Sequence, residues 1–323
     1  MCCLIKKKKN NNLKINTNKK SKQKSTTNNN INRVNKLETK KTTKKEKSTN
    51  NTNTKYSQLS IICDVDTLRT LIRKKAVRVV DVRRLDDYKK GHIPTAVSLP
   101  LSKVLENDTP EKIVKILEEI GVSDEMPIVI YDDTFGALAA RVAWTFQYVG
   151  HKNTALLSIT FSNWKSLGLE IEKKSNKFPE SKHSLNIDKS IYADANYVES
   201  IQNSNDSSTN KILVDSRERL NFLTEHIPSA TNIPYTMLGN NGNILREPTE
   251  LKRFIQNRGI STDSEVTTYC GSVGTLSGLA YYALKLAGVK NVKLYSKSFK
   301  DWKSLGKPKD EFLDANYWDL SAE

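Results

Sequence analysis

Cys270 is the residue of this chain best placed to do covalent chemistry. It follows the mixed run Glu265-Val-Thr-Thr-Tyr269 and precedes the small loop Gly271-Ser-Val-Gly-Thr275, behind which a helix-like stretch opens at Leu276. Backbone N–H groups of such a loop and of the first helical turn point at the sulfur and favour its anionic form. Because the thiolate is the nucleophile, the pattern indicates a reactive cysteine. The alternative is a buried cysteine that acts only as a small hydrophobic residue.

A repeat in the chain separates these two interpretations. Motifs of the first half recur 134 positions later, with Val80-Asp-Val-Arg83 matching Val214-Asp-Ser-Arg217 and His92-Ile-Pro-Thr-Ala96 matching His226-Ile-Pro-Ser-Ala230. After a short insertion the spacing becomes 138, which aligns Asn163-Trp-Lys-Ser-Leu-Gly168 with Asp301-Trp-Lys-Ser-Leu-Gly306. Self-similarity of this length predicts two copies of one domain. Cys270 aligns with Asp132, so only the second copy carries the thiol, and packing alone does not explain that difference.

The elements that must position the cysteine alternate along each copy. In the first copy, strands are expected at 76–82, 127–131 and 154–158, and helices at 110–120, 136–148 and 161–167. The second copy repeats them, with strands at 211–214, 266–269 and 292–295 and helices at 251–256, 276–287 and 299–305. This alternation predicts an α/β fold in which each copy is a parallel sheet with helices on both faces. Ligands of such sheets lie beyond the carboxyl ends of the strands, which is where Cys270 stands.

Composition divides the chain further. The net charge of +16 comes almost entirely from residues 1–55, which hold 17 Lys or Arg and two acids, so that the remainder is close to neutral. This Lys/Asn-rich tail has too few apolar residues to form a core, and we expect it to be disordered. The expected domains are then 56–173 (a copy without the thiol), a polar linker at 174–189, the reactive copy at 190–310 and a C-terminal extension at 311–323.

The tail has several possible roles. Its basic charge could bind an anionic membrane or nucleic acid weakly, and Met1-Cys-Cys-Leu could carry acyl chains next to the lysines. The alternative is a compositional drift with no specific role. No apolar run approaches the ~20 residues that span a bilayer, and no secretory signal is present. The four cysteines (2, 3, 63 and 270) form no pattern of paired spacings, which favours reduced thiols and a cytoplasmic protein, with Cys63 in a structural role.

Taken together, the motifs resemble the tandem-domain rhodanese family, the thiosulfate and 3-mercaptopyruvate sulfurtransferases. The features shared with that family are Asp-x-Arg, His-Ile-Pro-x-Ala followed by Pro, the cysteine loop and an aromatic-x-x-Trp motif. Tyr131-Asp132 and Ala140-Arg-Val-Ala-Trp144 are similar to the catalytically silent first half of the family. The resemblance covers roughly residues 56–306. It implies two rhodanese-like domains with the active site in the second, at the face between them.

The resemblance also implies roles for individual residues. Cys270 would be the nucleophile that carries a persulfide, and the loop residues Gly271, Ser272, Val273, Gly274 and Thr275 would hold the outer sulfur with their amides. Arg217 would bind the anionic sulfur donor. His92 would lie near the cleft, although His92 and His226 could equally be turn residues with no part in binding. No metal or cofactor is implied.

Several positions depart from the family pattern. The loop glycine stands one step late, at Gly274 behind Val273, while Gly136 keeps the same register in the first copy. Glu225 replaces the glycine before the second His-Ile-Pro, and Asn221 stands near the place of a second substrate arginine. The usual Asp-Gly-Ser-Trp of the second domain is Ser296-Lys-Ser-Phe299. These departures affect donor binding more than persulfide chemistry.

The resemblance predicts a sulfurtransferase that moves a sulfane sulfur from 3-mercaptopyruvate or thiosulfate to a thiol or cyanide. The loop lacks the basic residues typical of thiosulfate-specialised relatives, which favours 3-mercaptopyruvate. A cysteine-dependent phosphatase would need an arginine six positions after the cysteine, and Leu276 stands there. The remaining alternative is a non-catalytic tandem module that serves as a sulfur-carrier partner or scaffold. No stable protein partner is implied.

Overall fold

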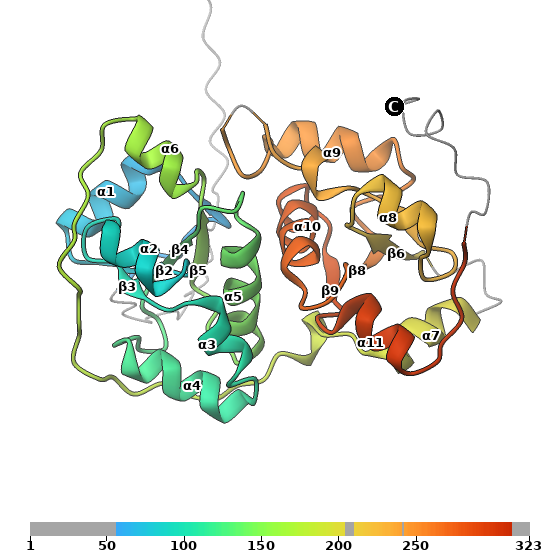
Figure 1. The fold of residues 1–323 in the computed structure, drawn as a ribbon, viewed down its shortest axis with the longest axis horizontal. Coiled ribbons are helices and arrows are strands. Elements are labelled where there is room, and N and C mark those ends of the chain that lie inside the picture. The colour runs from blue at the N-terminus through green and yellow to red at the C-terminus, as the bar shows by residue number, and fades with distance from the viewer. Residues whose placement is uncertain (1–55, 204–209, 241, 312–323) are drawn as a thin grey trace, which may run out of the picture. The chain divides into compact units, whose positions relative to one another are not determined.

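The computed structural model describes residues 56–203, 210–240 and 242–311. Within these residues the chain forms two parallel sheets flanked by helices, one sheet in each copy of the repeat (Figure 1). The predicted fold class is confirmed for this part of the chain. The predictions for the tail at 1–55 and for most of the extension at 311–323 concern residues outside the described ranges.

The first copy contains a five-stranded sheet of order β1-β5-β4-β2-β3, in which every pairing is parallel. Its strands are β1 (Ile62–Cys63), β2 (Arg78–Asp81), β3 (Val97–Ser98), β4 (Ile128–Tyr131) and β5 (Thr154–Leu157). Its helices are α1 (Val65–Arg73), α2 (Leu85–Lys90), α3 (Leu101–Leu105), α4 (Pro110–Glu119), α5 (Ala137–Tyr148) and α6 (Phe161–Ser166).

The second copy contains a four-stranded parallel sheet of order β7-β6-β8-β9. Its strands are β6 (Lys211–Asp215), β7 (Thr231–Asn232), β8 (Glu265–Tyr269) and β9 (Asn291–Leu294). Its helices are α7 (Ala195–Asn203), α8 (Arg219–Thr224), α9 (Pro248–Gln256), α10 (Thr275–Leu286) and α11 (Ser298–Ser304), with single 3-10 turns at Lys189–Ile191 and Tyr235–Met237.

Both faces of the central strands are covered. All four residues of β4 are buried, as are the last four of β8. Helices α5 and α10 follow these strands, and each begins behind a glycine in the left-handed region. The strands and helices predicted from the sequence are present, with ends that differ by at most three residues.

Helices α5 and α10 bring the two copies together. A Cβ atom at Gly278 of α10 would lie 3.3 Å from the backbone nitrogen of Arg141 in α5, so the absent side chain permits this close approach. One continuous cluster of buried hydrophobic residues includes Val142 of the first copy and Leu279 of the second. The thiol-bearing loop therefore precedes a helix that packs directly on the first copy.

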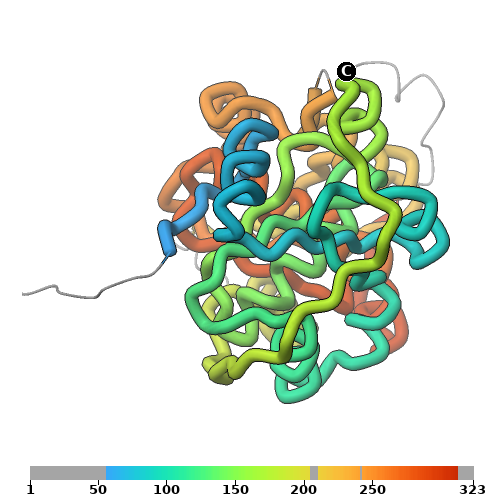
Figure 2. The backbone as a smooth tube through the Cα atoms, turned by 90° about the vertical axis from the view of Figure 1, so that its left-hand side faces the viewer, coloured from blue at the N-terminus to red at the C-terminus, as the bar shows by residue number. Residues whose placement is uncertain are grey.

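The segment 174–189 runs along the first copy in the view of Figure 2. Phe178 lies under the guanidinium group of Arg78, 3.2 Å from ring centroid to Cζ. Nδ1 of His151 lies 3.0 Å from Nε2 of His183, and both side chains are buried. This polar segment, expected to be a linker, is thus anchored on the first copy by specific contacts.

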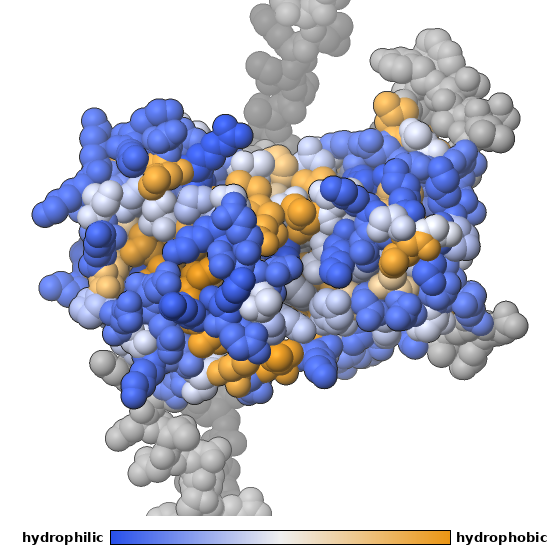
Figure 3. Space-filling model, turned by 60° about the horizontal axis from the view of Figure 1, so that its bottom comes forward, coloured by the Kyte–Doolittle hydropathy of each residue, from blue (hydrophilic) through white to orange (hydrophobic). Residues whose placement is uncertain are grey.

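The face drawn in Figure 3 is mostly hydrophilic, with separate hydrophobic patches.

Two exposed hydrophobic residues occupy matching places in the copies, Phe135 before Gly136 and Val273 before Gly274. In the described part of the chain, no helix has the length and apolar character needed to cross a membrane.

Candidate active site

Cys270 lies at the end of β8, where the chain turns into the loop before α10. Its side chain is 2% exposed. Its backbone N–H donates to Oγ of Ser298 (3.2 Å), and its Sγ lies 3.7 Å from the same oxygen. Ser298 Oγ donates in turn to the carbonyl of Tyr295 (2.9 Å). A hydroxyl held by a backbone carbonyl thus fixes the cysteine from the side of α11.

Ser298 is a site residue that the sequence interpretation missed. It is completely buried and has a φ of 60°, a conformation that costs energy for a residue other than glycine. Its counterpart in the first copy, Thr160, has a φ of −74° and caps α6 instead. The only signal in the sequence was its place in the unusual Ser296-Lys-Ser-Phe299 motif, which does not reveal the backbone conformation.

The glycine of the cysteine loop has a defined structural reason. Gly274 has a φ of 76°, and Gly136 in the first copy has a φ of 85°. A Cβ at Gly274 would lie 3.1 Å from both Cα and the carbonyl oxygen of Ser296. The late position of the glycine is therefore shared by both copies, and in each the residue caps the following helix.

The first copy shows what its loop can hold. The buried carboxylate of Asp132 accepts N–H groups from Thr134 (2.8 Å), Gly136 (2.9 Å) and Ala139 (2.9 Å). Burial raises the pKa of Asp132, and these N–H groups act against the rise. The loop and the first turn of α5 thus form a nest of converging donors around an acidic group.

The cysteine loop of the second copy occupies the place that corresponds to this nest. By the spacing of 138, Thr134, Gly136 and Ala139 correspond to Ser272, Gly274 and Ser277. Both loops are also held from behind in the same way. Phe161 N–H donates to the carbonyl of Asp132 (2.9 Å), and Phe299 N–H donates to that of Cys270 (3.0 Å).

Arg217 lies beside the loop, and its guanidinium group is bound within its own copy. Nε and Nη2 donate to the carboxylate of Asp215, and Nη2 also donates to the carbonyl of Glu225 (2.6 Å). Burial would lower the pKa of Arg217, but the bonds to Asp215 outweigh burial and raise it. Nη1 makes none of these bonds, so donor binding by Arg217 stays a prediction.

Arg83 repeats this arrangement in the silent copy. Its Nε and Nη2 donate to Asp81, and Nη2 also donates to the carbonyl of Gly91 (2.8 Å). The identical contacts in both copies show that the arginine of the Asp-x-Arg motif ties the strand end to the following turn. Any role in donor binding is additional to that structural one.

His92 is placed in the core of the first copy. It is fully buried, its ring stacks on Tyr88 with centroids 3.8 Å apart, and its Nδ1 lies 3.0 Å from the carbonyl of Tyr88. His226 stacks in the same manner on Phe222 at 3.9 Å. This repetition favours the turn-residue interpretation for both histidines over a role of His92 in binding.

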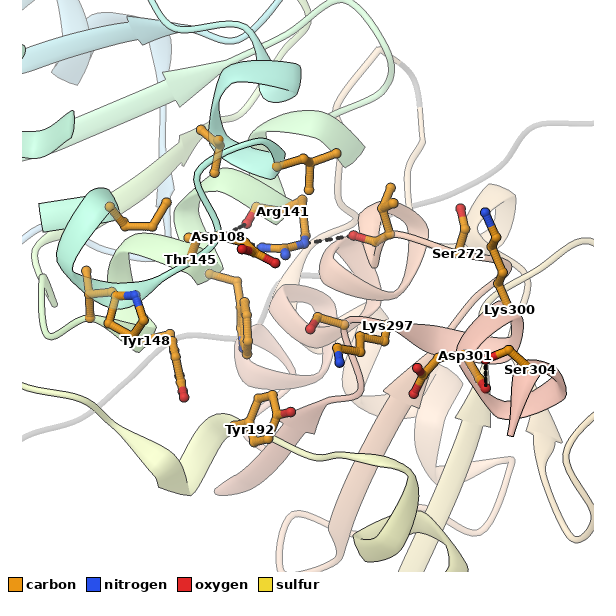
Figure 4. Close-up of a pocket in the computed structure, with 18 residues that line it drawn as sticks. Asp108, Arg141, Thr145, Tyr148, Tyr192, Ser272, Lys297, Lys300, Asp301 and Ser304 are labelled. Atoms are coloured by element: carbon orange, nitrogen blue, oxygen red, sulfur yellow. Dashed lines mark hydrogen bonds between the residues drawn. The ribbon is translucent and has the colours of Figure 1, made fainter. Parts of the chain in front are cut away.

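Two cavities flank the cysteine loop. The Gly271 cavity, of about 570 Å³, is lined by Arg217, Asn221, Tyr235, Gly271, Lys300 and Lys303, among others. The Ser272 cavity, of about 660 Å³, is lined by Asp108, Arg141, Tyr148, Tyr192, Ser272 and Lys300, among others (Figure 4). Both have the size of a small-molecule site. Lys300 borders both, and its backbone N–H donates to the carbonyl of Gly271 (3.0 Å).

Arg141 reaches the cysteine loop from the silent copy. Its Nε donates to the carbonyl of Val273 (2.7 Å) (Figure 4). The sequence interpretation used the stretch around Arg141 only as a mark of resemblance. A contact between residues 132 positions apart depends on how the copies pack, which the sequence pattern does not specify.

The described residues contain no group of three or more His, Cys, Asp or Glu side chains that could hold a metal ion. Cys63 is a buried free cysteine, and burial raises the pKa of its thiol to about 12. A thiol so rarely ionised fits a structural role.

Comparison with family models settles what the fold is. The model of the rhodanese-like domain matches the chain twice, at residues 64–167 and 194–305. The chain belongs to the rhodanese-like domain family. The two matches fall on the two copies of the repeat, one with Asp132 and one with Cys270.

Its relatives include named sulfurtransferases. The chain is 25% identical over 235 residues to 3-mercaptopyruvate sulfurtransferase of Escherichia coli, covering 67% of this chain and 82% of the relative. It is 28% identical over 242 residues to a putative thiosulfate sulfurtransferase of Saccharopolyspora erythraea, covering 68% and 84%. It is also 26% identical over 283 residues to the sulfur carrier protein TtuD of Thermus thermophilus, covering 77% and 96%. These relatives support a sulfurtransferase enzyme.

Solved structures share the fold. SseA from Escherichia coli, a 3-mercaptopyruvate sulfotransferase by its description, superposes with a TM-score of 0.65 at 24% identity, covering 75% of this chain and 99% of SseA. The anaerobic ergothioneine biosynthesis enzyme of Chlorobium limicola superposes with a TM-score of 0.69 at 20% identity, covering 78% and 70%. At these identities the likeness concerns the fold alone.

Proposed function

We propose that this rhodanese-family protein transfers a sulfane sulfur through a persulfide on Cys270. The observation that carries the proposal is the nest around Asp132, in which three N–H groups hold an acidic group. An aspartate oxygen and the outer sulfur of a cysteine persulfide are each three bonds from Cα. The silent copy therefore supports the interpretation that the same loop shape, with a cysteine in place of aspartate, accommodates a persulfide anion.

The first half-reaction would charge the cysteine. The Cys270 thiolate attacks the sulfur of the donor, so that a new S–S bond forms as the donor loses its sulfur. From 3-mercaptopyruvate, the C–S bond breaks with its electron pair leaving on carbon. That carbon gains a proton and the sulfur loses its thiol proton, so the products are pyruvate and the persulfide anion. From thiosulfate, the S–S bond breaks with its electron pair leaving on sulfite. Amides of the loop would stabilise the resulting persulfide anion.

The second half-reaction would return the enzyme to its starting state. A thiolate or cyanide attacks the outer sulfur, the Cys270 S–S bond breaks, and the product is a persulfide or thiocyanate. Cys270 leaves as a thiolate, so no redox partner is needed. The Gly271 and Ser272 cavities reach the loop from two sides, and either could admit these small anions.

Donor preference follows from the charges beside the loop. Loop residues Gly271 to Thr275 carry no cation, and Asn221 stands in the Gly271 cavity near the expected place of a second arginine. Lys303 there is bound to Glu225, which leaves Lys300 as an exposed cation for a carboxylate. This sparse positive charge suits the monoanionic 3-mercaptopyruvate better than the dianionic thiosulfate.

A second candidate function is sulfur carriage without a small-molecule donor. The relative TtuD is named a sulfur carrier protein, and the matched region covers 96% of its length. In that case Cys270 would accept sulfur from another protein's persulfide and hand it on.

The two candidates are separated by steady-state assays with the full chain. We expect turnover with 3-mercaptopyruvate and a thiol acceptor, and a lower specificity constant with thiosulfate and cyanide. Turnover with neither donor, together with sulfur uptake by Cys270 from a protein persulfide, would favour the carrier. Absence of sulfur on Cys270 in every case would overturn both.

A further inference from the structure

Arg141 belongs to the first copy in sequence but to the cysteine loop in space. Besides donating to the carbonyl of Val273, it packs on the loop glycine, since a Cβ at Gly274 would lie 3.3 Å from its Cδ. Figure 4 shows the side chain extending from α5 toward the residues of the second copy. The guanidinium group thus lies where the loop turns into α10.

The charge of Arg141 lacks a carboxylate contact. The residue is 8% exposed, and no salt bridge of Arg141 occurs among the described residues. Its Nη1 donates to Oγ1 of Thr145, a neutral group. Burial lowers the pKa of Arg141 to about 10, and negative charge on Cys270, followed by that on Asp108, acts against the decrease. A buried charge normally requires a counter-charge, and the loop that Arg141 contacts is the one that follows the cysteine.

Other charged groups face the loop, but none combines burial with a free charge. Arg217 approaches Gly271, but Asp215 neutralises it. Lys297 and Lys300 are exposed, so solvent screens them. Asp108, which is exposed, and Asp301, which is half-buried and accepts from the hydroxyl of Tyr295, are acids on the same cavity, and they oppose a negative charge on the sulfur.

The repeat shows that this contact is one-sided. By the spacing of 138, the counterpart of Arg141 in α10 is Leu279, which is buried in the hydrophobic core. The first copy therefore sends a cation to the cysteine loop of the second, and the corresponding position of the second copy carries none. Asp132, the residue that such a cation would serve, has its acidic group satisfied by backbone N–H groups.

We propose that Arg141 is the counter-ion of the Cys270 sulfur, so that the silent copy supplies the positive charge that stabilises the thiolate and the persulfide of the reactive copy. The inference rests on the proposed function only in taking Cys270 as the reactive sulfur. The role proposed for Arg141 is a positioning one, exerted through its charge and the loop carbonyl, and it is separate from any contact with a donor in the Ser272 cavity that Arg141 also lines.

The test measures the reactivity of Cys270 without any sulfur donor. The full chain is alkylated with iodoacetamide from pH 5 to 10, and the Cys270 peptide is quantified by mass spectrometry, which excludes signals from other cysteines. Arg141→Met removes the charge, Arg141→Gln keeps an N–H donor for Val273 without charge, and Arg141→Lys keeps the charge. We expect both neutral variants to shift the midpoint of the rate–pH profile upward by about one pH unit, which is roughly tenfold in thiolate at neutral pH. Arg141→Lys should restore most of that reactivity.

Arg78→Met is the matched control, because Arg78 is also a buried arginine of the first copy, packed on Phe178 and bound to the carbonyl of Gly121. It should lower the melting temperature without shifting the alkylation midpoint. An unshifted midpoint in folded Arg141→Gln would overturn the proposal, as would an equal shift in Arg78→Met.

A second measurement covers the case in which the Arg141 variants do not fold. If Arg141 and the thiolate stabilise each other, wild type should gain stability over Cys270→Ala as pH rises from 6 to 9. A difference in melting temperature that is independent of pH would contradict the proposal. Neither readout involves a donor, so a protein that fails to turn over but shows the shift refutes the sulfur-transfer proposal alone.

Discussion

The two copies of the repeat differ at the residue that directly follows the central strand. Asp132 follows β4 and Cys270 follows β8, and each is followed by a loop with a left-handed glycine at the same place. In the first copy the carboxyl oxygens of Asp132 accept the three N–H groups of the nest. In the second copy the Cys270 side chain is one atom shorter than that of Asp132, and it is charged only when the thiol is deprotonated. The comparison shows that the loop conformation belongs to both copies, whereas the side chain at its start differs between them.

A similar comparison holds for the surroundings of the loops. The first copy has a cavity of about 540 Å³ that matches the Gly271 cavity of the second. Matching residues line both cavities: Arg83 and Arg217, Asp87 and Asn221, Phe161 and Phe299, Lys165 and Lys303. The first copy thus has a cavity and a loop like those of the second, but it has no thiol.

The largest effect is expected from substituting Cys270, with a substitution of Asp132 as its counterpart in the first copy. Cys270→Ser should lower sulfur transfer from both donors to the background of the assay, because the hydroxyl cannot form the S–S bond. Its melting temperature should stay near that of wild type, because the change removes no core hydrophobic group of any size. Asp132→Asn is the matched variant and should retain turnover. Turnover by Cys270→Ser comparable to wild type would show that the chemistry lies elsewhere.

The arginine pair sharpens the comparison further. Arg83→Ala and Arg217→Ala each remove a buried partner of an aspartate, so both should lose stability, on the order of 3 kcal/mol in each case. The sequence-based prediction for Arg217 requires an additional loss of about 1.5–3 kcal/mol in donor use, or roughly ten- to hundredfold in specificity constant. Denaturant unfolding and kcat/KM are measured on both variants. Equal stability losses with unchanged donor use in Arg217→Ala would make the arginine purely structural.

Asp132 itself should contribute stability to the silent copy. Asp132→Ala leaves three N–H groups, two of them buried, without their acceptor, which should cost about 1–3 kcal/mol. The corresponding change Cys270→Ala should cost less, because no backbone N–H group donates to the cysteine sulfur among the described contacts. Urea unfolding of both variants checks the prediction, and a larger loss for Cys270→Ala would contradict the assignment of the nest.

A smaller, pH-dependent difference comes from the segment 174–189. Burial lowers the pKa of His151 to about 4, and it also lowers that of His183. The folded state keeps both rings neutral, whereas the unfolded chain takes up protons at a pKa of about 6.5. Stability is therefore complete above about pH 6.5 and falls as the pH drops toward 4.

The second copy has Val289 at the place of His151, so the effect should belong to the first copy. We expect a loss of about 1–2 kcal/mol between pH 7 and 5. The double change His151→Val and His183→Leu should flatten the dependence. An unchanged slope of unfolding free energy against pH in that variant would show that other groups cause it.

Much of the site could be predicted because the two copies of the repeat can be aligned with each other. The repeat indicated the fold, located Cys270 at a strand end and aligned Gly274 with Gly136, and the structure gives both glycines the same conformation. These features depend on residues close together in sequence, so local patterns were sufficient to find them.

What could not be predicted depends on distant contacts. Nothing near Ser298 or Arg141 in the sequence indicates their contacts. Ser298 meets Cys270, and Arg141 meets Val273, only because separate elements pack together. The helices α1, α2, α3, α7 and α8 were also missed, although α6, which is as short as α2 and α8, was predicted. Arg217 was identified as a donor-binding residue from the motif alone, whereas its bonds to Asp215 and Glu225 require the folded turn.

The persulfide is the central claim, and its mass is its most direct test. The purified full chain is incubated with 3-mercaptopyruvate or thiosulfate without acceptor, and its Cys270 and Asp132 peptides are examined by mass spectrometry. We predict a gain of one sulfur atom on the Cys270 peptide, removed by added cyanide or thiol, and no change on the Asp132 peptide. A Cys270 peptide without added sulfur after exposure to both donors, in a protein that still turns over, would contradict the account.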